Sequence, residues 1–447
     1  MKIAIIGNGI AGTTAAIEIR KNSSHEINII SSESKNFFSR TALMYVYMGH
    51  MRFEDIQPHP DEFWNIHDIN IIFNHVKFID FQNKNLLFPN NEKLRYDKLI
   101  LATGSNYNRF GWPGQDLGGV KGLYHYQDLE YLESRSDEIQ HAVIVGGGLI
   151  GIELAEMLHS RQKSVSLLVR EESYWDNVLP KEESNMISRH ILEHGFDLRL
   201  STNLMEINGD ENSIVKAVKT DKGDIIPCQH VGLTAGVHPN IKLVLDGPVE
   251  TNKGILVNEY LETNIPGVYA IGDCAEIRKP QPGRRNIEPV WYTGKLMGET
   301  VAVNILGEKK EYDPGIWYNS AKFLDIEYQV YGDVPNLPSE DQKSVYWEHP
   351  DGNKSIRINF NKHTNEVEGF NLMGVRYRHS VCDHWIKKKT DIREVLENLS
   401  LANFDPEFYP EYEASIRSTF TEQTGIPLKS KAKRNWDSVF TLIKGTK

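Results

Sequence analysis

Residues 2–12 read KIAIIGNGIAG, and this stretch decides the fold of the chain. Its first five residues have the apolar, β-branched composition of a buried parallel strand, and an amphipathic helical pattern begins at Ile10. Between them stand Gly7, Gly9 and Gly12 in a Gly-x-Gly-x-x-Gly fingerprint. The first glycine permits a tight turn, the second lets backbone approach a pyrophosphate, and the third allows close helix packing. The stretch therefore predicts a dinucleotide site with the phosphates at a helix N terminus.

A second fingerprint repeats this arrangement. Residues 141–151 read HAVIVGGGLIG, which is again a β-branched run, a glycine turn and the start of an amphipathic helix. One such motif is weak evidence, but two copies with matching flanks predict sites for two dinucleotides. The fingerprint residues predicted to contact them are Gly7, Gly9, Ile10, Ala11, Gly12, Gly146, Gly148, Leu149, Ile150 and Gly151.

Length and composition exclude several classes of protein. A chain of 447 residues is too long for one core and predicts about two to four domains. Its formal net charge of −11 argues against non-specific binding to nucleic acid or to an anionic membrane. The three cysteines are far apart, which argues against a disulfide framework or a four-cysteine zinc site and favours the cytoplasm. We also expect no membrane span, because no apolar stretch is long enough.

Three other predicted strands end in residues suited to a bound nucleotide. Residues 26–31 end at Ser31, and Glu33, just beyond, is either a ribose ligand or a solvated loop acid. The strand within residues 96–105 ends in Ala102-Thr103-Gly104, whose small side chains let a ligand approach the backbone. The strand within residues 264–275 is followed by Asp273, a carboxylate able to accept hydrogen bonds from a polyol.

The sequence does not decide whether the second nucleotide carries a 2′-phosphate. The strand at residues 163–169 ends before Arg170 and Glu171. An arginine at this position suits a 2′-phosphate, and an acid suits the free ribose hydroxyl. Both NADPH and NADH therefore remain candidates, with a slight preference for NADPH.

Together these motifs resemble the pyridine nucleotide-disulphide oxidoreductases, flavoproteins with two dinucleotide-binding domains. The resemblance is to the branch of ferredoxin, rubredoxin and nitrite reductase flavoproteins, and it covers roughly residues 1–325. It implies that the first fingerprint binds FAD and that the second binds NADH or NADPH. Asp273 would bind the ribityl chain, and Ala275, Trp291 and Tyr292 would border the isoalloxazine. The implied cofactor-binding residues beyond the fingerprints are Ser31, Glu33, Arg40, Ala102, Thr103, Gly104, Glu153, Arg170, Gly236, Gly272, Asp273, Ala275, Trp291 and Tyr292.

The departures from this family concern its redox thiols. Residues 37–45 occupy the region in which disulphide reductases carry a cysteine pair, and they contain no cysteine. Arg40 stands where related enzymes carry a single cysteine, so we expect no thiol relay. Tyr45 stands where ferredoxin-type reductases often have a lysine, and Glu153 matches the family glutamate near the nicotinamide. Tyr45 and Glu153 are therefore the predicted catalytic residues.

Two other groups of residues suggest chemistry that we do not assign. Cys274 follows Asp273, but a buried cysteine in this position is more simply a small packing residue. His379, Cys382 and His384 are metal-ligand types, yet one short cluster does not specify a site. We therefore predict no metal.

The predicted fold class is α/β with two Rossmann-like, three-layer domains. Residues 1–110 and 243–325 form a discontinuous FAD-binding domain, and the NAD(P)H-binding domain, residues 111–242, is inserted into it. Residues 326–447 form an α+β interface domain, because short alternating strands precede a helix near residues 390–396. The tail residues Lys429, Lys431, Lys433 and Arg434 are either a docking patch for an acidic electron carrier or a solvated charge run.

The predicted function is a FAD-dependent NAD(P)H oxidoreductase that reduces an external acceptor, such as ferredoxin or rubredoxin. One alternative is an NAD(P)H oxidase that uses dioxygen. Another is a redox-responsive protein similar to apoptosis-inducing flavoproteins, in which reduction changes assembly. The sequence does not identify the acceptor or the pathway, and a homodimer stays open.

Overall fold

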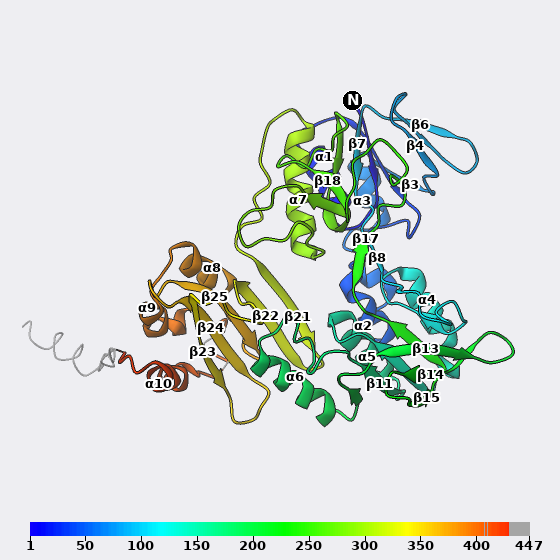
Figure 1. The fold of residues 1–447 in the computed structure, drawn as a ribbon. Coiled ribbons are helices and arrows are strands. Elements are labelled where there is room, and N and C mark those ends of the chain that lie inside the picture. Colours follow the sequence, from blue (N-terminus) through cyan, green and yellow to red (C-terminus); the bar gives the residue numbers. More distant parts are fainter. Residues whose placement is uncertain (406, 409, 429–447) are drawn as a thin grey trace, which may run out of the picture. The chain divides into compact units, whose positions relative to one another are not determined.

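The computed structural model describes residues 1–405, 407–408 and 410–428, which form two compact units (Figure 1). The first unit contains Met1–Asn177 and Ile187–Gly315. The second contains Val178–Met186 and the described residues from Ile316 on. The tail positions predicted as a docking patch or a charge run, residues 429–434, lie outside the described residues.

The first unit is built on two parallel sheets, and the first fingerprint lies in one of them. The strand order of this sheet is β19-β7-β1-β2-β3. Its strands are β1 (Lys2–Ile6), β2 (Glu26–Ser31), β3 (Ile69–Phe73), β7 (Lys98–Leu101) and β19 (Val268–Ala270). Strand β1 pairs with β2 on one side and with β7 on the other, so the loop after β1 lies at the switch point where such sheets bind nucleotides.

Helices α1 (Ile10–Asn22) and α7 (Trp291–Ile305) pack side by side in this part of the first unit (Figure 1). A Cβ atom at Gly298 would lie 2.6 Å from the backbone oxygen of Ala11, so only glycine permits this close approach. The other short helices of this part are η1 (Arg40–Ala42), α2 (Leu43–Tyr47), η2 (Phe53–Ile56), α3 (Asp61–Ile66) and η4 (Gly272–Cys274).

The second parallel sheet repeats the pattern around the second fingerprint. Its strand order is β12-β11-β10-β16-β9, with β10 between β11 and β16. Its strands are β9 (Val120–Lys121), β10 (His141–Val145), β11 (Ser164–Leu168), β12 (Asp197–Arg199) and β16 (His230–Leu233). The accompanying helices are α4 (Tyr126–Arg135), η3 (Ser136–Glu138), α5 (Leu149–Ser160) and α6 (Lys181–Glu193).

Smaller pieces of sheet complete the first unit. They are β4 (Phe78–Asp80), β5 (Asn85–Leu87), β6 (Lys93–Arg95), β8 (Ser105–Tyr107), β13 (Leu204–Gly209), β14 (Val215–Thr220), β15 (Ile225–Pro227), β17 (Val237–Pro239), β18 (Ile255–Val257) and β20 (Ala275–Ile277). Strands β8 and β17 pair with each other where the chain leaves and re-enters the part built on the first parallel sheet. This pairing holds the two segments that connect the parallel sheets next to each other.

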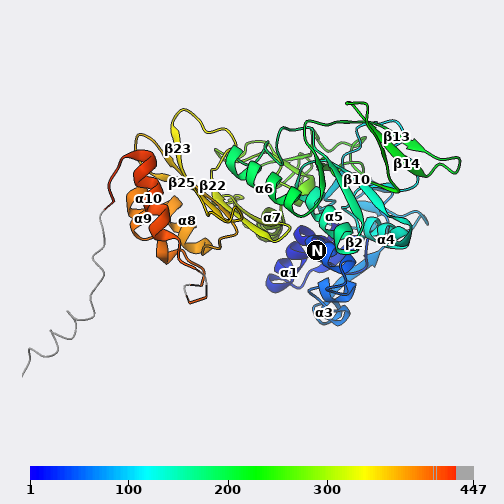
Figure 2. The same cartoon turned by 90° about the horizontal axis from the view of Figure 1, so that it is seen from below.

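The second unit is an antiparallel sheet with helices, as the sequence predicted. Its strands, in the order β21-β22-β25-β24-β23, are β21 (Tyr318–Phe323), β22 (Ile326–Gly332), β25 (Val367–Met373), β24 (Ser355–Asn361) and β23 (Gln342–Glu348). Its helices are α8 (His379–Lys387), α9 (Ile392–Glu397), η5 (Leu399–Leu401) and α10 (Glu413–Thr424). Figure 2 shows the α-helices on one face of the sheet, where apolar side chains of both layers form one core.

Two boundaries differ from those expected. Strand β21 pairs with β22, so the antiparallel sheet begins before residue 326. The segment Val178–Met186 packs with the second unit although the chain on either side of it belongs to the first. The ion pairs of Arg357 with Glu182 and Glu183 explain this placement, since they tie the start of α6 to strand β24.

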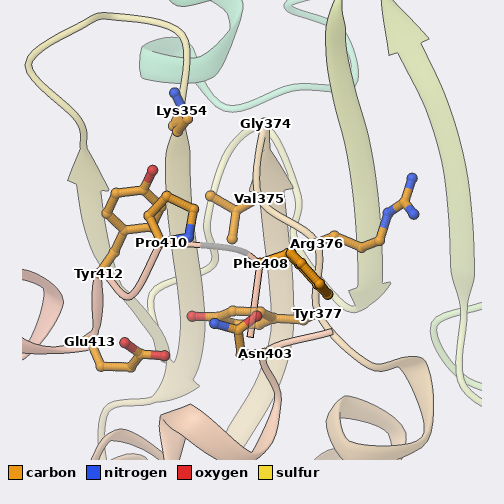
Figure 3. A pocket seen from close by; sticks show the side chains of 10 residues that line it. All are labelled: Lys354, Gly374, Val375, Arg376, Tyr377, Asn403, Phe408, Pro410, Tyr412 and Glu413. Carbon is orange, nitrogen blue, oxygen red and sulfur yellow. The ribbon is translucent and has the colours of Figure 1, made fainter. Parts of the chain in front are cut away.

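The second unit also contains a cavity of about 210 Å³ near α10 (Figure 3). Side chains of Val375, Tyr377, Tyr412 and Glu413 line it. The residues predicted to bind cofactors do not line this cavity. Within the described part of the chain, no helix is long and apolar enough to cross a membrane.

Candidate nucleotide-binding site

The first fingerprint forms a turn that other residues cannot adopt. Gly7 has φ of +114°, and a Cβ there would lie 2.0 Å from the backbone oxygen of Ala102. A Cβ at Gly12 would lie 2.1 Å from the backbone oxygen of Gly7. Gly9 differs, because a Cβ there meets no atom within 4 Å. Gly9 precedes Ile10 at the start of α1, so open space lies at the helix N terminus.

The second fingerprint has the same division of roles. Gly146 has φ of +126°, and a Cβ there would lie 2.6 Å from the backbone oxygen of Thr234. A Cβ at Gly151 would lie 2.5 Å from the backbone oxygen of Gly146. At Gly148, just before Leu149 and Ile150 begin α5, the nearest atom to a Cβ is the indole nitrogen of Trp175, at 3.9 Å. Both central glycines therefore leave room at a helix N terminus, which suits a pyrophosphate.

The end of β2 presents an ion pair. Arg40 donates two hydrogen bonds to Glu33, at 2.8 Å and 2.7 Å, and their side chains are mostly buried. Burial favours the neutral form of Glu33, but the hydrogen bonds from Arg40 outweigh it and hold the pKa of Glu33 well below its usual range. Glu33 is therefore a half-buried carboxylate that the ion pair with Arg40 holds in place.

Ser31 acts on the same loop through a side chain of the fingerprint. Its hydroxyl donates to the Asn8 side-chain oxygen at 2.9 Å, and the Asn8 amide donates to the Ser34 backbone oxygen at 2.9 Å. These bonds tie the loop after β2 to the fingerprint. A cavity of about 400 Å³ opens beside Glu33, lined also by Ser34, Phe73 and Tyr126.

Asp273 lies at the carboxyl end of β19, in η4 (Gly272–Cys274). It accepts a hydrogen bond of 3.0 Å from the Tyr124 hydroxyl, which itself accepts one of 3.0 Å from the Ser105 backbone. Burial raises the pKa of Asp273, and the bond from Tyr124 opposes this rise. Gly272 has φ of +71° and its Cβ position lies 3.0 Å from the Ala11 side chain, so Asp273 stands beside the first fingerprint.

The turn at residues 102–104 is held from the returning chain. The Thr103 hydroxyl donates to the Asn240 backbone oxygen at 2.6 Å, and the Asn240 backbone nitrogen donates to Gly104 at 2.8 Å. Gly104 and Gly236 have φ of +69° and +82°, which favours glycine at both positions. The Gly236 backbone oxygen accepts a hydrogen bond from the Asn108 backbone N–H. Gly236 therefore lies where the two chain segments that connect the parallel sheets run side by side.

Two of the residues implied to border an isoalloxazine lie at the start of α7, and the third, Ala275, lies in β20. Trp291 and Tyr292 begin this helix with their rings in an edge-to-face contact, and Trp291 is 37% exposed. Ala275 is buried at the start of β20. The Cβ position of Gly294, one turn along α7, lies 3.3 Å from Ile10 of the first fingerprint, which brings the helix start near that fingerprint.

The two predicted catalytic residues lie on neighbouring helices. Tyr45 belongs to α2, Glu153 belongs to α5, and α2 packs against α5. Arg161, just beyond α5, donates to the Tyr47 backbone oxygen at 2.8 Å and places its guanidinium 3.8 Å from the centre of the Tyr47 ring. This contact fixes α2 against the second sheet's helices.

Arg170 is not free to act alone on a ribose. It donates a hydrogen bond of 2.6 Å to Glu171, and the side chains are 73% and 19% exposed, respectively. The arginine favoured by NADPH and the acid favoured by NADH therefore form one pair.

The cysteines show no arrangement suited to thiol exchange. Cys228, Cys274 and Cys382 are free and buried, and each lies in a different hydrophobic core. Burial raises the pKa of each thiol, to about 12 for Cys228. Since a thiolate is the reactive form, all three are packing residues.

The sequence did not point to one segment of this site, residues 124–127. Tyr124 bonds Asp273, Tyr126 donates its backbone N–H to Glu33 at 2.9 Å, and Gln127 donates to the Glu33 backbone oxygen at 2.7 Å. These residues follow the turn-rich connector and open α4. An aromatic run at a helix start has no distinctive pattern, so only the fold reveals the contact.

Comparisons with known proteins agree with this geometry. Residues 1–295 match the model of the family described as pyridine nucleotide-disulphide oxidoreductase. The chain is 27% identical to the NAD(P)H nitrite reductase of Bacillus subtilis over 88% of its length, and 30% identical to the NADH oxidase of Methanocaldococcus jannaschii over 73%. The matches cover 48% and 75% of those two proteins. The chain spans half or less of the length of the nitrite reductase and of another curated relative.

A solved structure shows the same fold over most of the chain. The NADH:rubredoxin oxidoreductase of Clostridium acetobutylicum is 25% identical, with a TM-score of 0.70, and the match covers 89% of this chain and 99% of that one. Relatives thus include rubredoxin and nitrite reductases, and this chain has no cysteine pair in residues 37–45. The chain belongs to the pyridine nucleotide-disulphide oxidoreductase family.

Proposed function

We propose that this protein is a FAD-dependent NAD(P)H oxidoreductase that passes electrons to a small redox protein such as rubredoxin or ferredoxin. The observation that carries the proposal is the pair of open glycine turns, at Gly9 and Gly148, each at a helix N terminus. The three cysteines are free and buried, so we propose that no protein dithiol takes up electrons from the flavin. When bound, FAD supplies the hydride and electron chemistry, and the protein supplies binding and orientation.

The residues have separate tasks in this proposal. Backbone N–H groups after Gly9 bind the FAD pyrophosphate, and Glu33 and Asp273 bind its ribose and ribityl hydroxyls. Backbone after Gly148 binds the nicotinamide dinucleotide. Tyr45 and Glu153 orient the nicotinamide, and Trp291 and Tyr292 limit access of water. Residues 1–110, with the returning segment from 243, hold FAD, and residues 111–242 hold NAD(P)H.

The proposal also names the partners of the protein and its compartment. The nucleotide substrate is NADH or NADPH, and the carrier protein is the second partner. The three free cysteines suit a reducing compartment, so we propose the cytoplasm.

An acceptor comparison tests this function. The purified protein, loaded with FAD, is mixed with NADH or NADPH and with rubredoxin, ferredoxin, air or no acceptor. We expect steady nucleotide consumption with a carrier protein and much slower consumption with air alone. Fast consumption in air would instead favour an oxidase, the activity named for the Methanocaldococcus relative. Consumption that stops after one turnover in every mixture would contradict both enzyme functions.

A substitution at Arg170 tests nucleotide preference. In Arg170→Ala the charge-assisted bond to a 2′-phosphate is lost, and Glu171 loses its partner. We expect NADPH binding to weaken by about tenfold and NADH binding to change little. The two dissociation constants, measured by titration of the FAD-loaded protein, check this. Equal changes in both constants would remove Arg170 from the ribose site.

A further inference from the structure

Tyr124 contacts several residues of the proposed FAD site. Its hydroxyl donates to Asp273 at 3.0 Å and accepts from the Ser105 backbone at 3.0 Å. The same hydroxyl is the nearest atom to a Cβ at Gly104, at 3.5 Å. The residue therefore stands where the ends of two strands, β7 and β19, meet the connector to the second sheet.

The ring and the backbone of Tyr124 contact Arg40, which forms the ion pair with Glu33. The Arg40 guanidinium lies 4.6 Å from the centre of the Tyr124 ring and donates to the Tyr124 backbone oxygen. Arg40 in turn bonds Glu33, and Tyr126, the first residue of α4, donates its backbone N–H to Glu33. One tyrosine thus connects the acid proposed for the ribose with the acid proposed for the ribityl chain.

We propose that Tyr124 is a positioning residue that orients the Asp273 carboxylate to accept hydrogen bonds from the FAD ribityl chain. This rests on the proposed function. Hydrogen bonds to a charged group are stronger than neutral ones, and a buried carboxylate without its donor favours protonation. Removing the hydroxyl therefore weakens polyol binding in two ways, by freeing the carboxylate to rotate and by raising its pKa.

The titration of Asp273 can be followed through FAD binding because the groups that face it keep their charge states near neutral pH. Tyr124, Arg40 and Cys274 face it, and the pKa of each is raised, so these three keep their neutral-pH charge states. His125 faces Glu33 instead, with 3.6 Å between the ring nitrogen and the carboxylate.

Tyr124→Phe is the test, with Tyr131→Phe as its matched control. Tyr131 lies in α4, which begins two residues after Tyr124, and its hydroxyl accepts a bond of 2.7 Å from the Gly119 backbone. The dissociation constant of FAD is measured with apoprotein from about pH 5 to about pH 8. We expect Tyr124→Phe to bind FAD about tenfold more weakly at neutral pH, with the loss of affinity on acidification beginning at a higher pH. Tyr131→Phe should match the wild type in both respects.

Asp273→Asn provides a second measurement. It should bind FAD weakly without this pH dependence, and adding Tyr124→Phe to it should weaken binding no further. If the wild type binds FAD but Tyr124→Phe has the same affinity and pH profile, the positioning role is wrong. If the folded wild type does not bind FAD, the proposed function itself fails. Equal melting temperatures of the apoproteins exclude a folding defect as the cause of weaker binding. If Tyr124→Phe does not fold, Asp273→Asn decides the question: a wild-type pH profile of FAD binding in that variant contradicts the positioning role of Tyr124.

Discussion

Gly9→Val should abolish FAD binding while leaving the protein folded. A side chain at Gly9 meets no protein atom within 4 Å, and the φ angle of Gly9 is −69°, which valine adopts. The added side chain instead fills the space proposed for the pyrophosphate. Losing two hydrogen bonds between backbone and phosphate, each worth about 1.5–3 kcal/mol, weakens binding more than about a hundredfold. Flavin content after purification and the dissociation constant of added FAD measure this.

Two other glycines provide the controls for this result. Gly148→Val should keep FAD but lose affinity for NAD(P)H, because its open space belongs to the second site. Gly7→Ala should fail to fold, since its Cβ would lie 2.0 Å from a backbone oxygen and its φ is positive. Full flavin content in folded Gly9→Val would show that FAD does not lie at the first fingerprint.

Arg357→Met should destabilise the second unit strongly. Arg357 is 8% exposed and donates two hydrogen bonds, at 2.7 Å and 2.8 Å, to Glu183, which is fully buried. The substitution leaves the Glu183 carboxylate buried without its counter-charge, which costs about 3–5 kcal/mol of unfolding free energy. We expect the thermal transition of this unit to fall by about 10–20 °C in differential scanning calorimetry.

The pairing itself is tested by a second substitution. Glu183→Gln in the Arg357→Met background removes the unpaired charge and should recover part of the loss. Arg393→Met breaks an ion pair with Asp391 whose side chains are 51% and 30% exposed, so the transition should stay nearly unchanged. A transition in Arg357→Met as high as in Arg393→Met would show that the buried pair does not hold the start of α6 on this sheet.

Local pattern was enough to predict the two parallel sheets. In both fingerprints, β-branched strands, glycine turns and helix starts are neighbours in sequence, and the structure places β1 and β10 centrally in their sheets. The sequence also predicted Glu33 and Asp273 as cofactor ligands, because residues at the carboxyl ends of parallel strands lie at one edge of a sheet. The structure places each of them just beyond a strand of the first sheet.

Contacts between distant segments were beyond prediction. Nothing in a single sequence shows that Tyr124 reaches Asp273 across 149 residues, or that Arg357 reaches Glu183 across 174. The boundary expected at residue 325 was displaced for the same reason, since β21 belongs with β22 through its hydrogen-bond pairing. The pair of Arg170 with Glu171 is local, but sequence did not show whether these side chains bind each other.

The central claim is that NAD(P)H reduces a bound FAD and that reduction stops there. Anaerobic titration of the FAD-loaded protein with NADH or NADPH, followed by flavin absorbance, tests it most directly. We predict complete bleaching at about one equivalent per FAD, with the same endpoint when Cys228, Cys274 and Cys382 are all replaced by alanine. Absence of bleaching, or uptake of a second equivalent that disappears in the cysteine-free variant, would contradict the account.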